Sequence, residues 1–444
     1  MGLLQNKIIK DLPYRRFYSV DASGFSIIPD SVYVPSNLED IQHIIHHATH
    51  NNTTITCRGG GTGLTGGALN SGIILDMRLF NDLALNNDVL SAGSGVYKGM
   101  LDKILESKSR LYGPNPSVGP YCTVGGMVAN NAAGSHSLKY GCTIDNLIKI
   151  TIIDGRGDII TLPDNEHYSG MIYDICSDVD LDMYPCTTKN SSGYRLDAVT
   201  TPEDSHKVVA ASEGTLGVIV SVDLKTFTKP SLVYLVIISY ADGHGAASDC
   251  INILKLNPLS LEIMGPGVLY NDDNTVLFVE FDVPLAQWYD TLHNIAQGKI
   301  ILCEDKSDAQ IWWSRRSSAL SRTMSYYRDT PDIIEDVAVP LEKIPSFMEL
   351  LYELERRSSQ KVYYYGHIGN GNIHVRHPAN RHLSKWYLDS IMQMHGTITA
   401  EHGDGLGRTP YVAQQYGDKN YNAFLRLKEL FDPYTIFNPG KVVL

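Results

Sequence analysis

The glycine-rich segment at residues 58–67, RGGGTGLTGG, limits the fold of this chain more than any other stretch. It lies between two short apolar runs, residues 54–57 and 73–77, which we predict to be strands. Because glycine lacks a Cβ, such a loop adopts positive φ at little cost, and several of its N–H groups can converge on an anion. Flexible linkers are usually rich in serine and flanked by polar sequence, which is not the case here. The segment therefore predicts a phosphate-binding cradle.

Residues 61–66 of this loop also match the G-x-G-x-x-G pattern of dinucleotide-binding folds. That fold requires a helix to begin at the loop, with its N-terminus facing the pyrophosphate. The residues that follow, ALNSGIILDM, instead predict a loop and a strand. This context argues against a nicotinamide cofactor bound in the Rossmann manner.

A short strand and an amphipathic helix are predicted just before the glycine loop. Residues 32–34 form the apolar run VYV, which Pro35 ends, and residues 36–39 match a capping box. The apolar face of the helix that follows carries Leu38, Ile41, Ile44, Ile45 and Ala48. The opposite face carries His43, His46, His47 and His50. Histidines at this spacing can bind a metal, but a solvated helix face is the interpretation that we favour.

Two further regions are rich in small residues. Residues 112–146 contain paired glycines at 125–126 and the tripeptide Ala-Ala-Gly at 132–134, and residues 212–217 read SEGTLG before a predicted strand at 218–222. The absence of large side chains suits a close approach of the backbone to a flat ligand. A tightly packed crossing of a helix and a loop is the alternative.

The length and charge of the chain exclude several classes of protein. Its 444 residues suggest two or three domains at about 150 residues each. The net charge of −12 argues against nucleic acid as a partner, although a local basic patch stays open. No apolar run is long enough to span a membrane, and residues 1–17 lack the apolar core of a secretory signal. Seven scattered cysteines without a CxxC pair predict reduced thiols and a cytoplasmic location, with peripheral membrane association left open.

A second domain is predicted from about residue 230. Residues 232–239 and 275–281 indicate strands of an antiparallel sheet, and residues 341–357 indicate an amphipathic helix. A last helix is predicted at 421–430, ending before Pro433.

Residues 361–377, KVYYYGHIGNGNIHVRH, predict a β-hairpin with its turn near residues 369–372. Pairing residue 368 with 373 would place His367 opposite His374, so that both imidazoles could reach one ion. Glu401 is a candidate third ligand. Two histidines and one carboxylate suit a divalent transition metal at a catalytic site. Satisfied polar residues on a loop are the alternative.

Taken in order, these segments resemble the FAD-linked oxidase family, of the vanillyl-alcohol oxidase or PCMH type. The branch includes glycolate oxidase flavoprotein subunits, D-lactate dehydrogenases and D-2-hydroxyglutarate dehydrogenases. The resemblance runs almost end to end. The segments that carry it are 18–23, 29–35, 58–67, PNPS at 114–117, GGM at 125–127, NAAG at 131–134, KNSSGY at 189–194, 212–217, GHIGNGNIH at 366–374, AEHGDGLGR at 400–408 and FDPYTIFNPGK at 431–441.

The resemblance implies an α+β fold. We expect a PCMH-type FAD-binding domain of two subdomains at residues 1–228 and a cap domain with an antiparallel sheet at 229–394. A C-terminal segment at 395–444 would return to the flavin. The glycine loop would line the pyrophosphate, and Asn438 would lie close to the flavin ring. Relatives with covalent flavin carry a histidine in this loop; because this chain has none there, we expect non-covalent FAD. The implied FAD contacts are Arg58, Gly59, Gly60, Gly61, Thr62, Gly63, Pro116, Ser117, Gly125, Gly126, Asn131, Gly134, Glu213, Gly214, Gly217 and Asn438.

The resemblance also implies roles at the reacting centre. His402 would be the general base that takes the hydroxyl proton, because an imidazole titrates near neutrality. His367, His374 and Glu401 would hold zinc or manganese. The segment Trp312-Trp313-Ser314-Arg315-Arg316 resembles a Trp-x-x-Arg motif whose arginine binds the substrate carboxylate. The double tryptophan leaves the register ambiguous; we expect Arg315, with Arg316 and an ordinary surface role for both as alternatives.

The chain departs from the family pattern at three places. Asn370 stands where aspartate is common, Arg376 stands where asparagine is common, and the cap between residues 255 and 310 is short. Arg376 could favour a second anionic group on the substrate, so these departures leave the identity of the substrate open.

We therefore expect an FAD-dependent dehydrogenase or oxidase that converts a D-2-hydroxy acid, such as D-lactate, glycolate or D-2-hydroxyglutarate, to the 2-oxo acid. The alternatives are a flavoprotein subunit that is non-catalytic alone or depends on partners such as an iron–sulfur subunit, and a metal-dependent hydrolase. The electron acceptor is undefined, and a homo-oligomer is compatible with the sequence.

Overall fold

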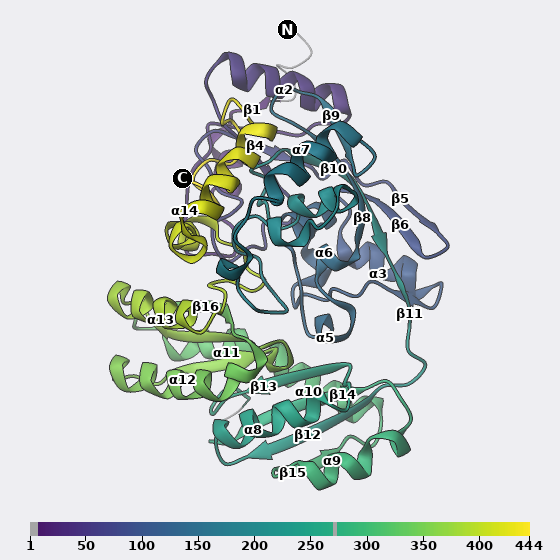
Figure 1. The fold of residues 1–444 in the computed structure, drawn as a ribbon, viewed down its shortest axis with the longest axis vertical. Coiled ribbons are helices and arrows are strands. Elements are labelled where there is room, and N and C mark those ends of the chain that lie inside the picture. The colour runs from purple at the N-terminus through teal and green to yellow at the C-terminus, as the bar shows by residue number, and fades with distance from the viewer. Residues whose placement is uncertain (1–7, 270–272) are drawn as a thin grey trace.

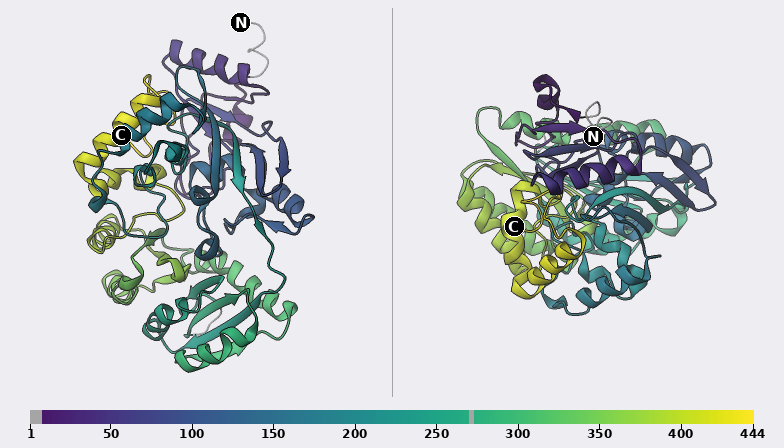
Figure 2. Two further views of the ribbon diagram at one scale, coloured as in Figure 1. Left: turned by 45° about the vertical axis from the view of Figure 1, so that its right-hand side comes forward. Right: turned by 90° about the horizontal axis from the view of Figure 1, so that it is seen from above.

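The computed structural model describes residues 8–269 and 273–444 and shows two lobes (Figures 1 and 2). Residues 1–7 lie outside the described residues, and they are part of the segment 1–17 in which we recognised no secretory signal. The upper lobe in Figure 1 holds the chain up to the strand β11 (Phe227–Thr228) together with the C-terminal helix α14 (Gly405–Phe431). The lower lobe holds the intervening residues. Mixed helices and sheets in both lobes confirm the α+β class, while the boundaries 1–228, 229–394 and 395–444 stay a prediction.

The first sheet of the upper lobe carries the glycine loop. Its strands lie in the order β1-β2-β4-β3, and β4 pairs in parallel with both β2 and β3. The strand bounds are β1 Ile8–Ile9, β2 Ser31–Tyr33, β3 Ile55–Arg58 and β4 Ile73–Asp76. Helix α2 (Leu38–His50) buries Ile41, Ile44 and Ile45 against this sheet. The cap of α2 differs from the prediction by one residue, because Asn37 accepts from the N–H of Asp40, while Asp40 binds Ser36 in return.

The second sheet of the upper lobe is antiparallel in the order β5-β6-β10-β8-β9. Its strands are β5 Leu83–Asn86, β6 Val89–Gly93, β8 Leu147–Ile153, β9 Ile159–Leu162 and β10 Val218–Lys225. A short strand β7 (Arg110–Leu111) pairs with β11. The helices of the upper lobe are α1 Leu12–Phe17, α3 Lys98–Glu106, α4 Val124–Ala129, α5 Ser137–Tyr140, α6 Thr143–Asn146 and α7 Glu166–Cys176. The apolar faces of α3, α4, α7 and α14 share one core with the sheet.

The lower lobe is built on an antiparallel sheet in the order β15-β12-β14-β13-β17-β18-β16. Its strands are β12 Tyr234–Tyr240, β13 Ser260–Met264, β14 Thr275–Phe281, β15 Lys299–Leu302, β16 Asp332–Ala338, β17 Tyr363–Gly366 and β18 Asn372–Pro378. One face packs on α8 Gly243–Leu254, α9 Tyr289–Ile295, α12 Ile344–Ser358 and α13 Arg381–Gln393. The other face packs on α10 Lys306–Ser317 and α11 Ala319–Tyr326.

Short 3₁₀ helices connect several of these elements. They are Gly119–Tyr121, Leu181–Met183, Leu196–Ala198, Pro202–Val209, Leu285–Gln287, Leu341–Lys343 and η7 Ile368–Asn370. Helix α14 is broken at Gly417, whose φ of 69° is not helical. Among the described residues, no helix has both the length and the apolar character that a membrane crossing needs.

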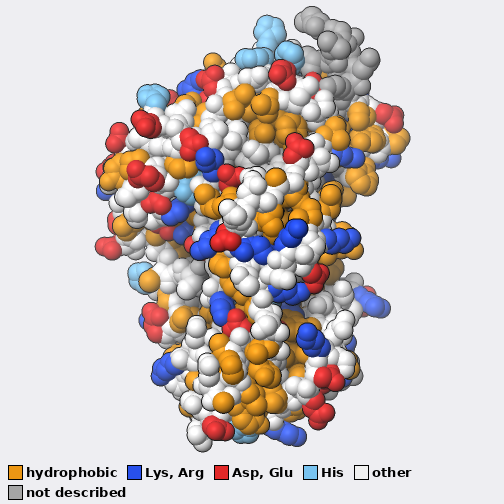
Figure 3. Space-filling model, turned by 90° about the vertical axis from the view of Figure 1, so that its right-hand side faces the viewer, with side chains coloured by type: hydrophobic (Ala, Val, Ile, Leu, Met, Phe, Trp, Pro, Cys, Tyr) orange, Lys and Arg blue, Asp and Glu red, His pale blue; other side chains and the backbone are white. Residues whose placement is uncertain are grey.

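The negative net charge is not spread evenly over the surface. Figure 3 shows Lys and Arg side chains gathered in a band across the middle of one face, with a hydrophobic area below it.

The α5 segment bridges the two lobes, because Lys139 Nζ lies 2.5 Å from Asp282 Oδ2 and His136 Nε2 lies 2.9 Å from Glu280 Oε2. The lobes are therefore joined by ion pairs as well as by the chain.

Candidate active site

A cleft of about 600 Å³ lies against the glycine loop. It is lined by segments from both sheets of the upper lobe, by Leu320 of α11 and by the C-terminal segment at Glu401 and His402. The predicted cofactor contacts among its lining residues are Arg58, Gly59, Gly60, Gly61, Thr62, Gly63, Pro116, Ser117, Gly125, Gly126, Glu213, Gly214 and Gly217. The structure therefore brings most of the implied cofactor residues to one cavity.

The first glycines of the loop are required by packing. A Cβ on Gly59 would lie 2.1 Å from Thr123 Oγ1, and a Cβ on Gly60 would lie 2.1 Å from the carbonyl oxygen of Tyr121. Gly61 has a φ of +66°, which other residues rarely adopt. The loop can thus lie directly on the backbone of residues 121–123 only because it lacks side chains, and this contact forms one wall of the cleft.

Two positions in the cleft suit an elongated phosphate-bearing ligand. A Cβ on Gly63 would meet nothing closer than Asn130 Nδ2 at 4.0 Å, so packing within the protein does not explain this glycine. The buried Ser94 Oγ also lines the cleft and has no hydrogen-bond partner within the described residues. An open glycine and an unpaired hydroxyl facing one cavity fit a ligand that approaches the backbone and accepts a hydrogen bond.

Three predicted cofactor residues lie behind the lining. Asn131 is fully buried and donates to the carbonyl oxygen of Asn190 at 3.0 Å. A Cβ on Gly134 would lie 2.0 Å from the carbonyl oxygen of Asn115. Asn438 donates to Gly67 O at 2.9 Å and to Glu213 O at 2.6 Å, and accepts from Thr56 Oγ1 at 3.0 Å. In the structure these residues hold the walls of the cleft in place.

Glu213 joins the cleft to the C-terminal segment. Its Oε1 accepts from the N–H groups of Asp404 at 2.5 Å and Gly405 at 3.1 Å, where α14 begins. Burial raises the pKa of Glu213 to about 8, and burial also raises the pKa of Asp404 to about 6. Glu213 thus lines the cleft and also fixes the loop that carries Glu401 and His402.

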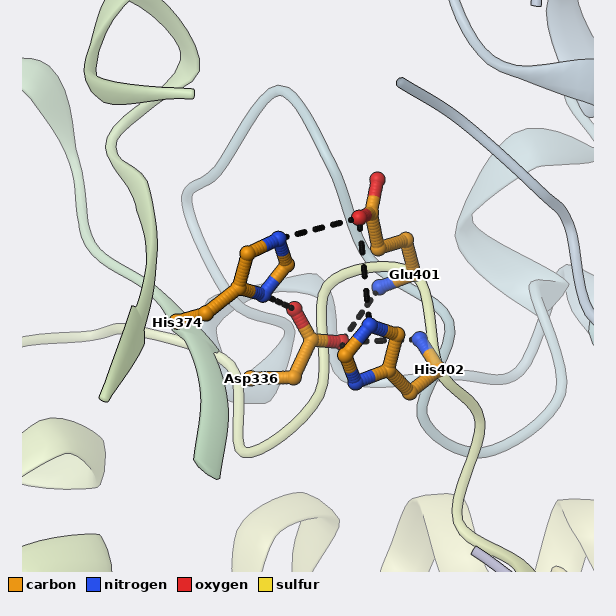
Figure 4. Close-up of side chains that lie close together, drawn as sticks. All are labelled: Asp336, His374, Glu401 and His402. Atoms are coloured by element: carbon orange, nitrogen blue, oxygen red, sulfur yellow. Dashed lines mark hydrogen bonds and ion pairs between the residues drawn. The ribbon is translucent and has the colours of Figure 1, made fainter. Parts of the chain in front are cut away.

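A cluster of imidazoles and carboxylates lies where the cleft ends. It consists of His367, His374, Glu401, His402 and Asp336, and we call it the imidazole cluster. Glu401 Oε1 lies 3.3 Å from Nε2 of both His367 and His374. The rings of His374 and His402 are stacked, with centroids 4.9 Å apart (Figure 4). Atoms of Asp336, His374, Glu401 and His402 that could bind a metal all lie within 4.8 Å of one another.

The hairpin that brings His367 and His374 together has a different register from the one predicted. Residue 374 pairs with Tyr365 and not with His367. Gly366 and Gly371 have positive φ values of 141° and 66°, and η7 occupies the tip between them. The strand therefore ends at Gly366, and His367 lies in the connection. The two imidazoles are still adjacent, with centroids 5.5 Å apart.

Each of the two hairpin histidines has a buried carboxylate beside its Nδ1. Glu262 Oε1 lies 2.5 Å from His367 Nδ1, and Asp336 Oδ1 lies 3.2 Å from His374 Nδ1. A carboxylate at Nδ1 leaves Nε2 as the atom that faces a metal, an arrangement common at metal sites. Because both Nε2 atoms face Glu401, the chemistry of the predicted set His367, His374 and Glu401 suits a divalent ion. His367 is not among the residues whose ligand atoms all lie within 4.8 Å of one another, however, whereas Asp336 and His402 are.

The charges of the cluster are strongly coupled. Burial alone would lower the pKa of His374, but the carboxylates of Asp336 and Glu401 outweigh it and raise this pKa to about 9. Burial lowers the pKa of His402 to about 4, and the charge of His374 adds to this effect. His402 is therefore neutral near pH 7 and can accept a proton.

Three residues of the site were missed from the sequence: Glu262, described above, and also Asp336 and Lys189. Asp336 Oδ2 accepts from the backbone N–H groups of Glu401 and His402, both at 2.8 Å, and so shapes the loop that carries them. Lys189 is fully buried, and its Nζ lies 3.2 Å from Glu401 Oε2. A charged residue within the apolar strand IIEDVAV was the available signal for Asp336.

The two candidate arginines on α10 occupy different surroundings. Arg315 is half-buried, and its guanidinium lies 4.7 Å from the ring centroid of Trp312. Arg316 is buried and donates to Glu262 Oε2 through Nη2 at 2.6 Å. The structure thus brings Arg316, the residue that we did not favour from the sequence, to the imidazole cluster.

The two family departures on the hairpin are also buried. Arg376 follows His374 on the same face of β18 and forms an ion pair with Asp332. Asn370 donates to Thr188 Oγ1 at 3.0 Å in the upper lobe. Asn370 therefore helps to hold the hairpin against the upper lobe.

Models of two protein families match the chain. A model described as an FAD binding domain matches residues 29–163, and a model described as the C-terminal domain of FAD linked oxidases matches residues 261–442. The chain belongs to the FAD-linked oxidase family. Within this family, the protein is an FAD-dependent oxidoreductase. Most residues that line the cleft at the glycine loop lie within residues 29–163, the part that the FAD-binding model matches.

Several FAD-linked oxidases of known name are similar along almost the whole chain. Glycolate oxidase subunit GlcD of Bacillus subtilis is 27% identical, aligning 96% of this chain with 92% of that protein. A D-lactate dehydrogenase of Anaerostipes hadrus is 27% identical, with coverages of 93% and 89%. A D-2-hydroxyglutarate dehydrogenase of Stutzerimonas stutzeri is 22% identical, with coverages of 98% and 96%.

The fold of this FAD-linked oxidase also matches solved structures. An alkyldihydroxyacetonephosphate synthase superposes with a TM-score of 0.69 at 15% identity, covering 98% of this chain and 84% of that one. At this identity the likeness concerns the fold alone. Together with the match to the FAD-binding model, it confirms the expected α+β architecture.

Proposed function

We propose that this protein oxidises a D-2-hydroxy acid, such as D-lactate, glycolate or D-2-hydroxyglutarate, to the 2-oxo acid. The observation that carries the proposal is that the glycine-lined cleft ends at Glu401 and His402 of the imidazole cluster. A ligand with a flat ring held in the cleft would therefore lie beside a neutral imidazole and a buried carboxylate. The named substrates of similar proteins support the same class.

FAD, held without a covalent bond, would supply the acceptor for the hydride that leaves the substrate carbon. His402 takes the hydroxyl proton on its imidazole, which burial keeps neutral. Its ring stacks on that of His374, and this contact sets the plane of the imidazole. Asp336 fixes the backbone of His402 from the other side. These contacts place the base before the substrate arrives.

His367, His374 and Glu401 are the residues that would hold a divalent ion, zinc or manganese, whose charge would stabilise a developing alkoxide. Lys189 and the two histidines keep the pKa of Glu401 well below its usual range despite burial. Glu401 is thus an anion at neutral pH, as a metal ligand must be. His374, whose pKa the neighbouring carboxylates raise to about 9, would have to release a proton when an ion binds.

Arg316 is the residue that we propose for the substrate carboxylate, in place of Arg315. Its Nε and Nη2 both donate to one oxygen of Glu262. Its Nη1 has no hydrogen-bond partner within residues 8–269 and 273–444. A guanidinium with one edge occupied can still bind a carboxylate through its outer edge.

The test is anaerobic reduction of the FAD-loaded protein by a panel of hydroxy acids. We expect D-lactate, glycolate or D-2-hydroxyglutarate to bleach the flavin absorbance, and L-lactate to leave it unchanged. Loss of bleaching after chelation would assign the metal a role. A protein that binds FAD but is bleached by no D-2-hydroxy acid would contradict the proposal.

A partner-dependent subunit is a second candidate function, favoured by the name of the similar Bacillus protein as a subunit. In that case substrate would bleach the flavin of the isolated chain, but turnover with soluble acceptors would need additional chains. An iron–sulfur protein recovered with the tagged chain from its native cells, together with restored turnover, would support this function. A metal-dependent hydrolase is disfavoured because it has no use for the glycine-lined cleft.

A further inference from the structure

Glu262 is the one charged residue of β13 and stands at the centre of that strand. All residues of β13 (Ser260–Met264) are buried, and the Glu262 side chain has no exposed surface. A buried carboxylate is costly unless charged or hydrogen-bonding partners surround it. Its partners therefore indicate why this strand carries a glutamate.

The two oxygens of Glu262 hold two different groups. Oε1 lies 2.5 Å from Nδ1 of His367, and Oε2 accepts from Nε and Nη2 of Arg316 at 3.1 and 2.6 Å. These partners lie on the hairpin connection and on α10, so they do not share a local element. One side chain on a rigid central strand thus fixes both.

The orientation of α10 is fixed at a second point. Trp313 Nε1 donates to Glu280 Oε1 at 3.0 Å, and Glu280 lies on β14, which neighbours β13 in the sheet. Arg316 therefore cannot move away from the sheet without breaking contacts with two strands. His367 is also held at two atoms, because its Nδ1 faces Glu262 and its Nε2 lies 3.3 Å from Glu401 Oε1.

We propose that Glu262 is a positioning residue that sets the distance between the guanidinium of Arg316 and the Nε2 face of His367, and thereby selects acids whose hydroxyl lies on the carbon next to the carboxylate. The inference rests on the proposed function. A 3-hydroxy acid places its hydroxyl one carbon–carbon bond, about 1.5 Å, farther along the chain. A misplacement of about 1 Å can lower a rate by about 10²-fold, so a fixed distance discriminates between the two classes.

The test compares E262Q and E262D with the wild type in the full chain. The first readout is zinc affinity of the metal-free, FAD-loaded protein by calorimetry. The second is the ratio of kcat/KM for D-2-hydroxybutyrate to that for D-3-hydroxybutyrate. E262Q removes the carboxylate behind the histidine ligand, and E262D withdraws it by one methylene group. Loss of such a contact typically weakens metal binding by about 10–100-fold, and we expect both variants to show this. We expect the selectivity ratio to fall by about tenfold or more, with flavin content unchanged.

Two further variants separate positioning from folding. E335Q is the matched control, because Glu335 is a buried carboxylate on β16 that pairs with Arg408 at 3.1 Å, and no hydrogen bond joins it to an imidazole within the described residues. It should lower thermal stability without changing zinc affinity or selectivity. R316K keeps a positive charge beside Glu262 but loses the planar guanidinium with its paired N–H donors. It should therefore lower the ratio of the two kcat/KM values, while zinc affinity stays at the wild-type value.

Wild-type zinc affinity together with a wild-type selectivity ratio in E262Q and E262D would overturn the inference. So would a wild-type protein that binds no zinc, or an R316K variant with unchanged selectivity. Failure of the proposed function is a separate result: the wild-type flavin would be bleached by no hydroxy acid, while the zinc titration would still test the contact between Glu262 and His367.

Discussion

The glycine-lined cleft and the imidazole cluster are built in opposite ways. The cleft is formed by backbone that comes close together because side chains are absent, as at Gly59 and Gly60. The cluster is formed by side chains that converge from the hairpin, β16 and the C-terminal segment. At Gly59 and Gly60 the cleft therefore has no room for an added side-chain atom, whereas the cluster depends on keeping its charged groups. Substitutions in the cleft should therefore impair flavin content, and substitutions in the cluster should impair the reaction rate.

Replacing Gly60 by valine should have the largest effect. The new Cβ would lie 2.1 Å from the carbonyl oxygen of Tyr121, so the loop must move off the 121–123 backbone and the cleft must change shape. We expect G60V to purify without flavin absorbance and without activity. The control is G170A, because a Cβ on Gly170 in α7 meets nothing within 4 Å and should stabilise the helix by about 0.5–1 kcal/mol. Full flavin content in G60V would show that the loop does not hold FAD.

Replacing His402 by asparagine should damage chemistry but not the cleft. Loss of a general base typically lowers a rate by about 10²–10⁴-fold, and we expect a loss of this size in the rate of flavin bleaching by substrate. Flavin content should match the wild type, because Asn130 and Thr65 donate to the backbone carbonyl of His402, which the substitution keeps. Bleaching at the wild-type rate would remove His402 from its proposed role.

Removing a metal should give a smaller, reversible effect on the cluster alone. After dialysis against a chelator, we expect activity to fall by about 10–100-fold and to return with zinc or manganese, while FAD stays bound. E401Q should show the low activity without recovery. A chelated protein that keeps full activity and contains no metal by elemental analysis would contradict the metal site.

The smallest effect is expected in the pH profile. Because burial lowers the pKa of His402 to about 4, its imidazole is already deprotonated at pH values above about 5. The reaction needs this deprotonated base, so kcat/KM should change by less than about threefold between about pH 5.5 and pH 8. An acidic limb centred near 6.5, the ordinary value of histidine, would show that His402 is more exposed in solution than in the structure. H402N should lack any such limb.

The sequence predicted the cleft better than the cluster for a physical reason. A glycine loop between two strands is a local pattern, and the strands β3 and β4 lie within a residue or two of their predicted positions. The cluster depends on contacts between distant residues. Glu262 and His367 are 105 residues apart, and Lys189 and Glu401 are 212 apart. A single sequence contains no local signal for such pairs.

One wrong prediction and one open choice near the cluster have local causes. The hairpin register was wrong because Gly366 and Gly371 both adopt positive φ, which inserts a 3₁₀ turn where a tight turn was expected. The choice between Arg315 and Arg316 depended on which tryptophan begins the motif. Helical spacing could not decide it, since neighbouring residues on α10 point about 100° apart and the orientation of the helix is set by the sheet.

The amide of Asn438 has a consequence for how the protein is made. It ties Glu213 and the end of the glycine loop together and contacts Thr56, which is 382 residues earlier in the chain. During synthesis, the amino-terminal lobe emerges from the ribosome long before this amide does. The contacts of Asn438 with Thr56, Gly67 and Glu213 therefore cannot form until residue 438 has been synthesised, so the amino-terminal lobe begins to fold with this end of the glycine loop still untied.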